Sequence, residues 1–111
     1  MREIRLLDPV YGAEIYLLIG GTTEEVAERT GDKTFQNSYK GYCFHDMEEP
    51  YRPFYVWVES PQLPLLCHEL FHLTVTVLGD KGLSLTDESE EAYTYWFENI
   101  MEQVERLRIL G

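Results

Sequence analysis

The feature that most constrains this chain is the apolar run over residues 65–78, which has prolines before it and a glycine after it. Pro61 and Pro64 predict that a helix begins between residues 60 and 64, because proline is tolerated only in a first helical turn. Gly79 is the predicted C-terminal cap of this helix. Because the run is apolar on almost every side, we expect a helix that is buried all round.

Inside this run lies His68-Glu69-Leu70-Phe71-His72, which contains the pattern His-Glu-x-x-His. On a helix, His68 and His72 project from one face a turn apart, so both imidazoles can bind one Zn²⁺. Glu69 can then reach a metal-bound water as a general base without ligating the metal. The alternative is an accidental order of two partly buried histidines and an acid. Such groups inside a buried helix are costly unless something pairs with them, and a metal does so.

Length and charge limit the classes of function. The 111 residues predict one domain, residues 1–111, and a hydrophobic content of 44% is enough to form its core. Nine Lys and Arg against twenty Asp and Glu give a formal net charge of −11, which repels phosphate backbones. We therefore expect no nucleic-acid partner. The charge leaves open an acidic protein that occupies a basic groove on another protein.

Redox compartment and targeting are also constrained. The two cysteines, Cys43 and Cys67, do not make a disulfide framework, and both are expected to be small core residues. Residues 1–5 carry charge where a signal peptide has its apolar region, and no apolar run reaches the roughly 18 residues of a membrane span. We expect a soluble, cytoplasmic protein with no membrane partner.

The first 60 residues are predicted to form strands and one short helix. Four segments have strand character: residues 3–7, 13–19, 41–45 and 54–59, of which the last two are expected to pair antiparallel. Thr22 and Glu25 make a capping box, which predicts a helix to about Thr30 that is ended by Gly31. Residues 32–40 are a predicted loop and residues 46–53 a surface turn.

A second long helix is predicted from Asp87, with Glu90 in the capping-box position. Its apolar residues follow the spacing of one helical face: Tyr93, Trp96, Phe97, Ile100, Met101, Val104 and Leu107. The expected fold class is α+β, with a small mixed or antiparallel sheet packed on the histidine-bearing helix and on this C-terminal helix.

A catalytic zinc site commonly has three protein ligands and one water. The acidic candidates that follow His72 are Asp80, Asp87, Glu88, Glu90, Glu91 and Glu98. Glu90 lies nearer the main apolar stripe, whereas Glu91 shares a second face with Ala92 and Tyr95 that could pack on the histidine-bearing helix. Helical geometry alone leaves both residues open as the third ligand.

His68-Glu69-Leu70-Phe71-His72, followed after 18 residues by Glu91-Ala92, resembles the zincin metallopeptidases of the gluzincin type. The wider run over residues 66–104 resembles small zincin-like proteins encoded by bacteriophages and prophages. The resemblance implies Zn²⁺ on His68, His72 and Glu91, with Glu69 as general base. For the oxyanion donor that a peptidase needs, Tyr95 is the first candidate, followed by Tyr93 and His45.

Three functions follow from these observations. The first is a zinc-dependent metallopeptidase, in which Glu69 deprotonates a metal-activated water that attacks a bond of a peptide or protein substrate. An extended substrate could add to an exposed sheet edge. The second keeps the fold and the zinc without turnover and acts through a protein partner. The third is an acidic inhibitor or mimic protein of phage type.

Overall fold

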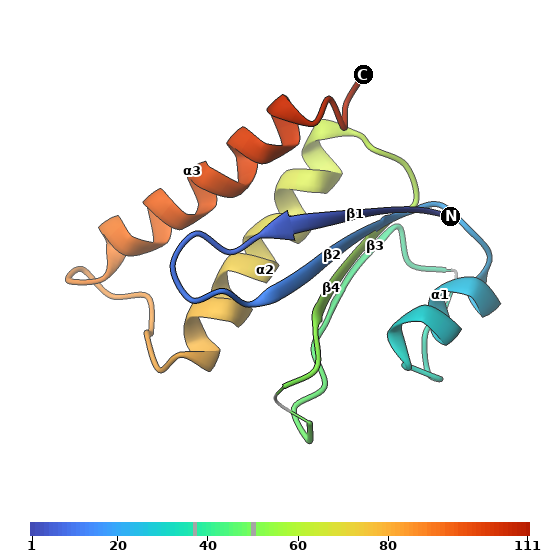
Figure 1. Cartoon of the computed structure of the whole chain (residues 1–111), viewed down its shortest axis with the longest axis horizontal. Coiled ribbons are helices and arrows are strands. Elements are labelled where there is room, and N and C mark those ends of the chain that lie inside the picture. Colours follow the sequence, from blue (N-terminus) through green and yellow to red (C-terminus); the bar gives the residue numbers. More distant parts are fainter. Residues whose placement is uncertain (37, 50) are drawn as a thin grey trace.

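The computed structural model describes residues 1–36, 38–49 and 51–111; Asn37 and Pro50, in the predicted loop 32–40 and turn 46–53, lie outside them. Figure 1 shows a sheet with helices on both of its faces. In chain order the elements are β1 (Arg2–Leu7), β2 (Glu14–Ile19), α1 (Thr23–Thr30), β3 (Gly41–Phe44), β4 (Phe54–Val58), α2 (Leu63–Asp80) and α3 (Glu90–Arg106). The predicted α+β class is confirmed, as are the four predicted strands.

The sheet is mixed, with strand order β1-β2-β4-β3. β1 pairs antiparallel with β2, and β3 pairs antiparallel with β4, as predicted from sequence. The two hairpin-like halves are joined by the parallel pair β2 and β4. This order leaves β3 at one edge of the sheet.

Two apolar clusters lie on opposite faces of this sheet. On one face, α2 and α3 pack over residues such as Leu17, Val56 and Val58. On the other, α1 and Phe35 cover Leu18, Tyr55 and Trp57. All five residues of β4 are buried, because helices cover both faces of this inner strand.

The capping box of α1 is confirmed. The Thr22 hydroxyl accepts a hydrogen bond from the Glu25 amide at 3.1 Å, and the Glu25 carboxylate accepts one from the Thr22 amide at 3.0 Å. Gly31 ends the helix in the left-handed region at φ 79°, which glycine adopts without a steric penalty.

Helix α2 departs from the prediction in two ways. It continues through Gly79 to Asp80, so the predicted cap at Gly79 is wrong. It is also not buried all round: Phe71, His72 and Val75 are among its exposed residues, because the sheet and α3 cover only part of its circumference. Within the described part of the chain, no helix, α2 included, has both the length and the apolar character to cross a membrane.

Helix α3 begins at Glu90, so the predicted start at Asp87 and the capping role of Glu90 are wrong. Residues 86–89 instead form a turn in which the Ser89 hydroxyl accepts from the Thr86 amide at 2.8 Å. The predicted apolar face is confirmed in its central part, where Tyr93, Trp96, Ile100 and Val104 are buried. Leu107 lies beyond the helix end and is exposed, because the chain turns there.

Asp8 connects the β1–β2 turn to α3. Its carboxylate accepts hydrogen bonds from the amides of Val10, Tyr11 and Ala13 at 2.9–3.1 Å and from the Trp96 indole at 3.0 Å. Burial opposes ionisation of this carboxyl, but the four donors outweigh burial and lower its pKa. The ionised Asp8 carboxylate therefore stabilises the β1–β2 turn and its contact with α3.

We predict that Asp8→Ala lowers the free energy of unfolding by roughly 2–3 kcal/mol at neutral pH, because several hydrogen bonds to a charged group are lost. A group with a lowered folded pKa stabilises above its unfolded value, about 3.9, and loses this effect as pH falls through the folded value. The difference between wild type and variant should therefore shrink below about pH 4 in urea unfolding curves.

The matched control for this measurement is Asp87→Ala, which removes an exposed carboxylate from a loop. It should change the free energy of unfolding by less than about 0.5 kcal/mol. An Asp8→Ala variant as stable as this control would mean that the turn does not depend on the carboxylate.

Candidate metal centre

Helix α2 brings His68, Glu69 and His72 together. One ligand atom from each of these residues lies within 4.8 Å of the others. The two imidazole rings are 4.9 Å apart between centroids at an interplanar angle of 73°, and His68 Nε2 lies 3.7 Å from the Glu69 carboxylate. The i and i+4 spacing thus places both histidines on one side of the helix, as predicted.

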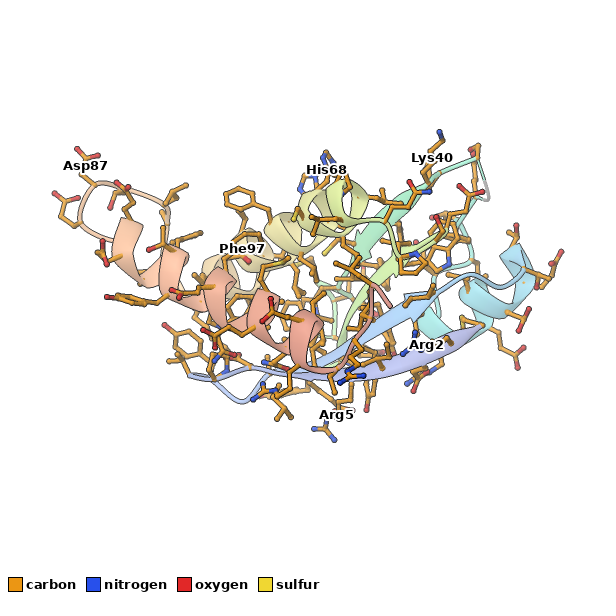
Figure 2. All side chains as sticks on the ribbon, turned by 90° about the horizontal axis from the view of Figure 1, so that it is seen from above. Arg2, Arg5, Lys40, His68, Asp87 and Phe97 are labelled. Carbon is orange, nitrogen blue, oxygen red and sulfur yellow. The ribbon has the colours of Figure 1, made fainter. Side chains whose placement is uncertain are left out.

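The three side chains differ sharply in exposure. Leu66, Leu70 and Leu73 are fully buried, and they fix the face of α2 that packs on the sheet. The histidines therefore lie on the outer side, where 66% of the His68 side chain is exposed, whereas only 8% of the Glu69 side chain is exposed. Figure 2 shows His68 at the molecular surface.

Glu69 lies against the first residue of the edge strand β3. A Cβ atom added to Gly41 would be 2.6 Å from Glu69 Cγ, 2.9 Å from Glu69 Cδ and 2.9 Å from Leu65 Cδ1. These distances are shorter than van der Waals contact allows. Only glycine permits this close approach of the strand to the Glu69 side chain.

Burial raises the pKa of Glu69 above its ordinary value, while the neighbouring His68 and His72 act in the opposite direction. A carboxylate of raised pKa is a stronger proton acceptor than an exposed one. This is the direction that a general base at neutral pH requires.

A groove of about 370 Å³ runs between β3 and α2 beside this group. It is lined by Tyr39, Gly41, Tyr42, Cys43, Glu69, His72 and Thr76. Burial raises the pKa of the Cys43 thiol to about 12, so the thiol stays protonated and neutral. Sequence reasoning did not select Tyr39, Gly41 or Cys43 as site residues, because their proximity to Glu69 depends on how β3 packs against α2.

The His68, Glu69 and His72 group could hold a metal ion. Two neutral imidazoles and a nearby carboxylate are ligand types that Zn²⁺ binds, and His68 and His72 are exposed, so an ion can reach them. Ligand atoms of one tetrahedral zinc lie roughly 3.4 Å apart. The ligand atoms here lie within 4.8 Å of one another, which is near that spacing.

Glu91 and Glu90 are both exposed, and neither belongs to the group of ligand atoms around His68. One contact between the two helices is that of Phe71 on α2 with Phe97 on α3, whose ring centroids are 5.8 Å apart. At 1.5 Å per residue, Glu91 begins about 9 Å from Phe97 along α3. The structure therefore does not bring Glu91 to the histidines.

The predicted oxyanion donors also lie outside the group. Tyr95 is 66% exposed and lines a different hollow together with Val10 and Tyr11 of the β1–β2 turn. The Tyr93 hydroxyl donates to the Leu83 carbonyl at 2.6 Å. His45 is buried and stacked on Phe54, with ring centroids 3.8 Å apart.

Ala92 lines the same hollow as Tyr95, so the face shared by these residues packs toward the β1–β2 turn and not toward the histidines. Glu90 instead lines a pocket that also contains Phe71. Of the two neighbouring acids, Glu90 is the one that lines a pocket together with Phe71 of α2, and it is also the acid that helical phase places nearer the apolar stripe.

A scan against models of protein families, a search of curated proteins and a search of solved structures each found no match. The function is therefore argued from the geometry of the site.

We predict that Gly41→Ala lowers the free energy of unfolding by about 1–3 kcal/mol, because the added methyl group overpacks the contact with Glu69. Urea unfolding of the metal-free protein measures this. The control is Gly79→Ala in α2, where an added Cβ meets no atom within 4 Å and where alanine favours the helix.

The same substitution in a Glu69→Ala background tests whether Glu69 is the residue that is displaced. Gly41→Ala should cost less there, because the Cγ and Cδ atoms in its way are gone and only Leu65 remains close. Equal costs in the two backgrounds would contradict the contact between Gly41 and Glu69.

Proposed function

We propose that this protein is a zinc-dependent metallopeptidase of zincin-like architecture that hydrolyses a bond of a peptide or protein substrate. The observation that carries the proposal is the position of Glu69, a buried carboxylate of raised pKa that lies between two exposed histidines and an edge strand. Burial of a carboxylate costs free energy, and the nearby His68 and His72 offset this cost only in part, since the pKa of Glu69 is still raised.

The position of β3 at the edge of the sheet favours a peptide as substrate. The Lys40 carbonyl accepts from the Glu59 amide at 2.8 Å, so residues 40 and 59 form a hydrogen-bonded pair of the antiparallel ladder. Such pairs alternate, which turns the amide and carbonyl groups of Gly41 and Cys43 toward the open edge. An extended peptide that adds to this edge would hydrogen-bond at Gly41, directly beside Glu69.

The residues of the groove have separate roles in the proposed reaction. His68 and His72 would hold the ion, and bound Zn²⁺ supplies Lewis acidity and lowers the pKa of water. Glu69 accepts a proton from the attacking water, and its raised pKa lets it hold that proton and then give it to the departing amine. Tyr39 is half exposed and lines the groove, so its hydroxyl replaces Tyr95 as the proposed oxyanion donor.

The third ligand in this proposal is Glu91, on the resemblance to gluzincins. Its carboxylate is exposed at the start of α3, immediately after the turn at residues 86–89. Ligation by Glu91 would require this end of α3 to approach the middle of α2. Without it, the two imidazoles would leave the remaining coordination positions to water.

The separation of Glu91 and Tyr95 from the histidines favours a second candidate function. In it, His68 and His72 bind zinc without turnover, and the domain acts through a protein partner. Metal content does not distinguish the two functions, whereas the role of Glu69 does, because only hydrolysis requires a proton acceptor.

We predict that the protein purified without added metal contains one Zn²⁺ per chain, measured by elemental analysis. His68→Ala and His72→Ala should each weaken zinc binding by at least about 100-fold. Loss of a residue that only hydrogen-bonds to a ligand costs up to about 100-fold, and loss of a ligand itself should cost at least as much. The matched control is His45→Phe, which removes the third histidine but keeps a ring on Phe54. Unchanged zinc affinity in His68→Ala would remove the metal site.

Zinc titrations of Glu91→Ala and Glu90→Ala belong to the same experiment. If Glu91 is a ligand, its removal weakens zinc binding severely while Glu90→Ala leaves it nearly intact, because a ligand contributes charge and geometry to the ion. Equal affinities in the two variants would exclude Glu91.

We predict that Glu69→Gln retains zinc and the fold but hydrolyses no peptide, because an amide fills the same space and cannot accept a proton. Mass spectrometry of a mixed peptide library measures cleavage, with Glu102→Gln on the exposed face of α3 as control. Hydrolysis by Glu69→Gln at the wild-type rate would exclude Glu69 as the base. A zinc-loaded wild type that cleaves no peptide would favour the second function.

A further inference from the structure

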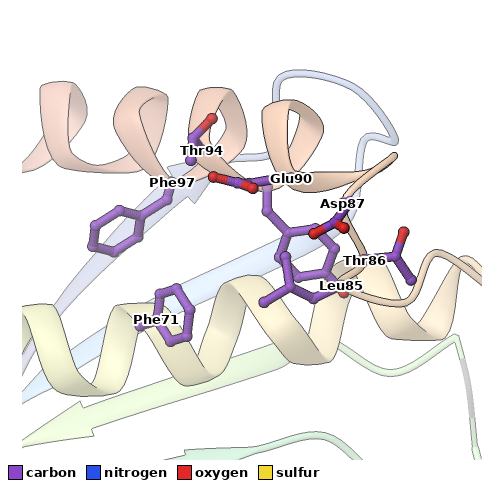
Figure 3. A pocket seen from close by; sticks show the side chains of 8 residues that line it. Phe71, Leu85, Thr86, Asp87, Glu90, Thr94 and Phe97 are labelled. Carbon is purple, nitrogen blue, oxygen red and sulfur yellow. The ribbon is translucent and has the colours of Figure 1, made fainter.

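A second pocket, separate from the groove at β3, opens between α2 and α3. Its volume is about 390 Å³, and its apolar walls come from Phe71 of α2, Leu85 of the connecting loop and Tyr93 and Phe97 of α3. Figure 3 shows Phe71 and Phe97 facing each other across the two helices, with the carboxyl groups of Asp87 and Glu90 on the α3 side of the opening.

Two contacts hold the aromatic side chains of this pocket. The Tyr93 hydroxyl is held by the Leu83 carbonyl, and the ring is buried. Phe71 and Phe97 meet edge to face, with ring planes at 79°. Phe71 is nevertheless 45% exposed, so aromatic surface remains accessible to a ligand. The two contacts lower the cost of ordering these aromatic side chains when a ligand binds.

The two carboxylates at the opening have no cationic partner within the described residues. Asp87 and Glu90 take part in none of the ion pairs or side-chain hydrogen bonds found there, and Glu88 and Glu91 add exposed negative charge beside them. Like charges gathered around a low-dielectric pocket attract cations and repel anions. The ligand that complements this pocket therefore has an apolar stem and a positive end.

We propose that this pocket binds the arginine side chain of a peptide. The three methylene groups of arginine suit the apolar walls, and its planar guanidinium can stack on Phe71 or Phe97 while it pairs with Asp87 and Glu90. A lysine ammonium is compact and strongly hydrated, so it gains less from the aromatic walls. A free inorganic cation would leave the apolar walls without a partner.

The pocket lies close to the candidate metal centre along α2, since Phe71 directly precedes His72. Its use as a specificity pocket, which selects substrates with arginine near the cleaved bond, rests on the proposed peptidase function. Binding of arginine itself does not, because the pocket contains none of the residues of the proposed zinc site, His68, Glu69, His72 and Glu91. The two can therefore be tested separately.

The experiment is a titration of the full, metal-free chain, labelled with ¹⁵N, with three acetylated and amidated tripeptides. Their central residues are arginine, norleucine and glutamate between alanines. Arginine should bind at least about threefold more tightly than norleucine, and glutamate should not bind, with amide shifts concentrated at residues 85–97. A double variant, Asp87→Asn with Glu90→Gln, should lower arginine affinity by about threefold to tenfold and leave norleucine unchanged.

The matched control is Glu102→Gln with Glu105→Gln, which removes the same charge from a part of α3 outside this pocket. Phe71→Ala should weaken arginine and norleucine together. No preference for arginine, or an equal loss in the control variant, would overturn the proposal. Arginine binding by a protein that contains no zinc and hydrolyses no peptide would contradict the peptidase function alone. Hydrolysis without arginine binding would contradict the proposed arginine pocket alone.

Discussion

The packing of α2 against the sheet is the interaction on which the other features of this protein depend. Leu66, Leu70, Leu73 and Val77 are fully buried on one side of this helix. At about 0.8 kcal/mol for each buried methylene, this face contributes several kcal/mol and fixes the rotation of the helix about its axis. The same rotation exposes His68 and His72 and buries Glu69.

The position of Glu69 illustrates a conflict between stability and chemistry. A carboxylate in this environment costs free energy, which is expressed in its raised pKa. Gly41 restricts the same site, since the backbone of β3 lies so close to Glu69 that a Cβ atom at position 41 would clash with its side chain. Together these features place a carboxylate of raised pKa beside the edge strand of the sheet.

Helix α3 has a role that its apolar stripe alone does not reveal. Its buried side completes the core with Trp96 and Ile100, while its start borders the pocket around Phe71. Phe71 in the middle of α2 contacts Phe97 in the middle of α3. Glu90, about two helical turns before Phe97, therefore lines the aromatic pocket together with Asp87 of the preceding loop.

The sequence by itself determined what depends on neighbours along the chain. The four strands, the capping box at Thr22, the central apolar face of α3 and the meeting of His68 with His72 follow from local periodicity and capping chemistry. The predicted capping box at Asp87 was wrong, because residues 86–89 form a turn there and α3 begins only at Glu90. The prediction that α2 is buried all round was wrong. The apolar composition of a helix does not show how many other elements pack against it.

Only the tertiary structure decided which residues surround the histidines. The closeness of Gly41 to Glu69 joins residues from two elements, and it depends on the side-by-side packing of β3 and α2. The positions of Glu90, Glu91 and Tyr95 depend on the rotation and register of α3, where one residue changes the direction of a side chain by about 100°. Periodicity fixes these directions relative to a helix axis, but the packing of side chains in the core fixes the axis itself.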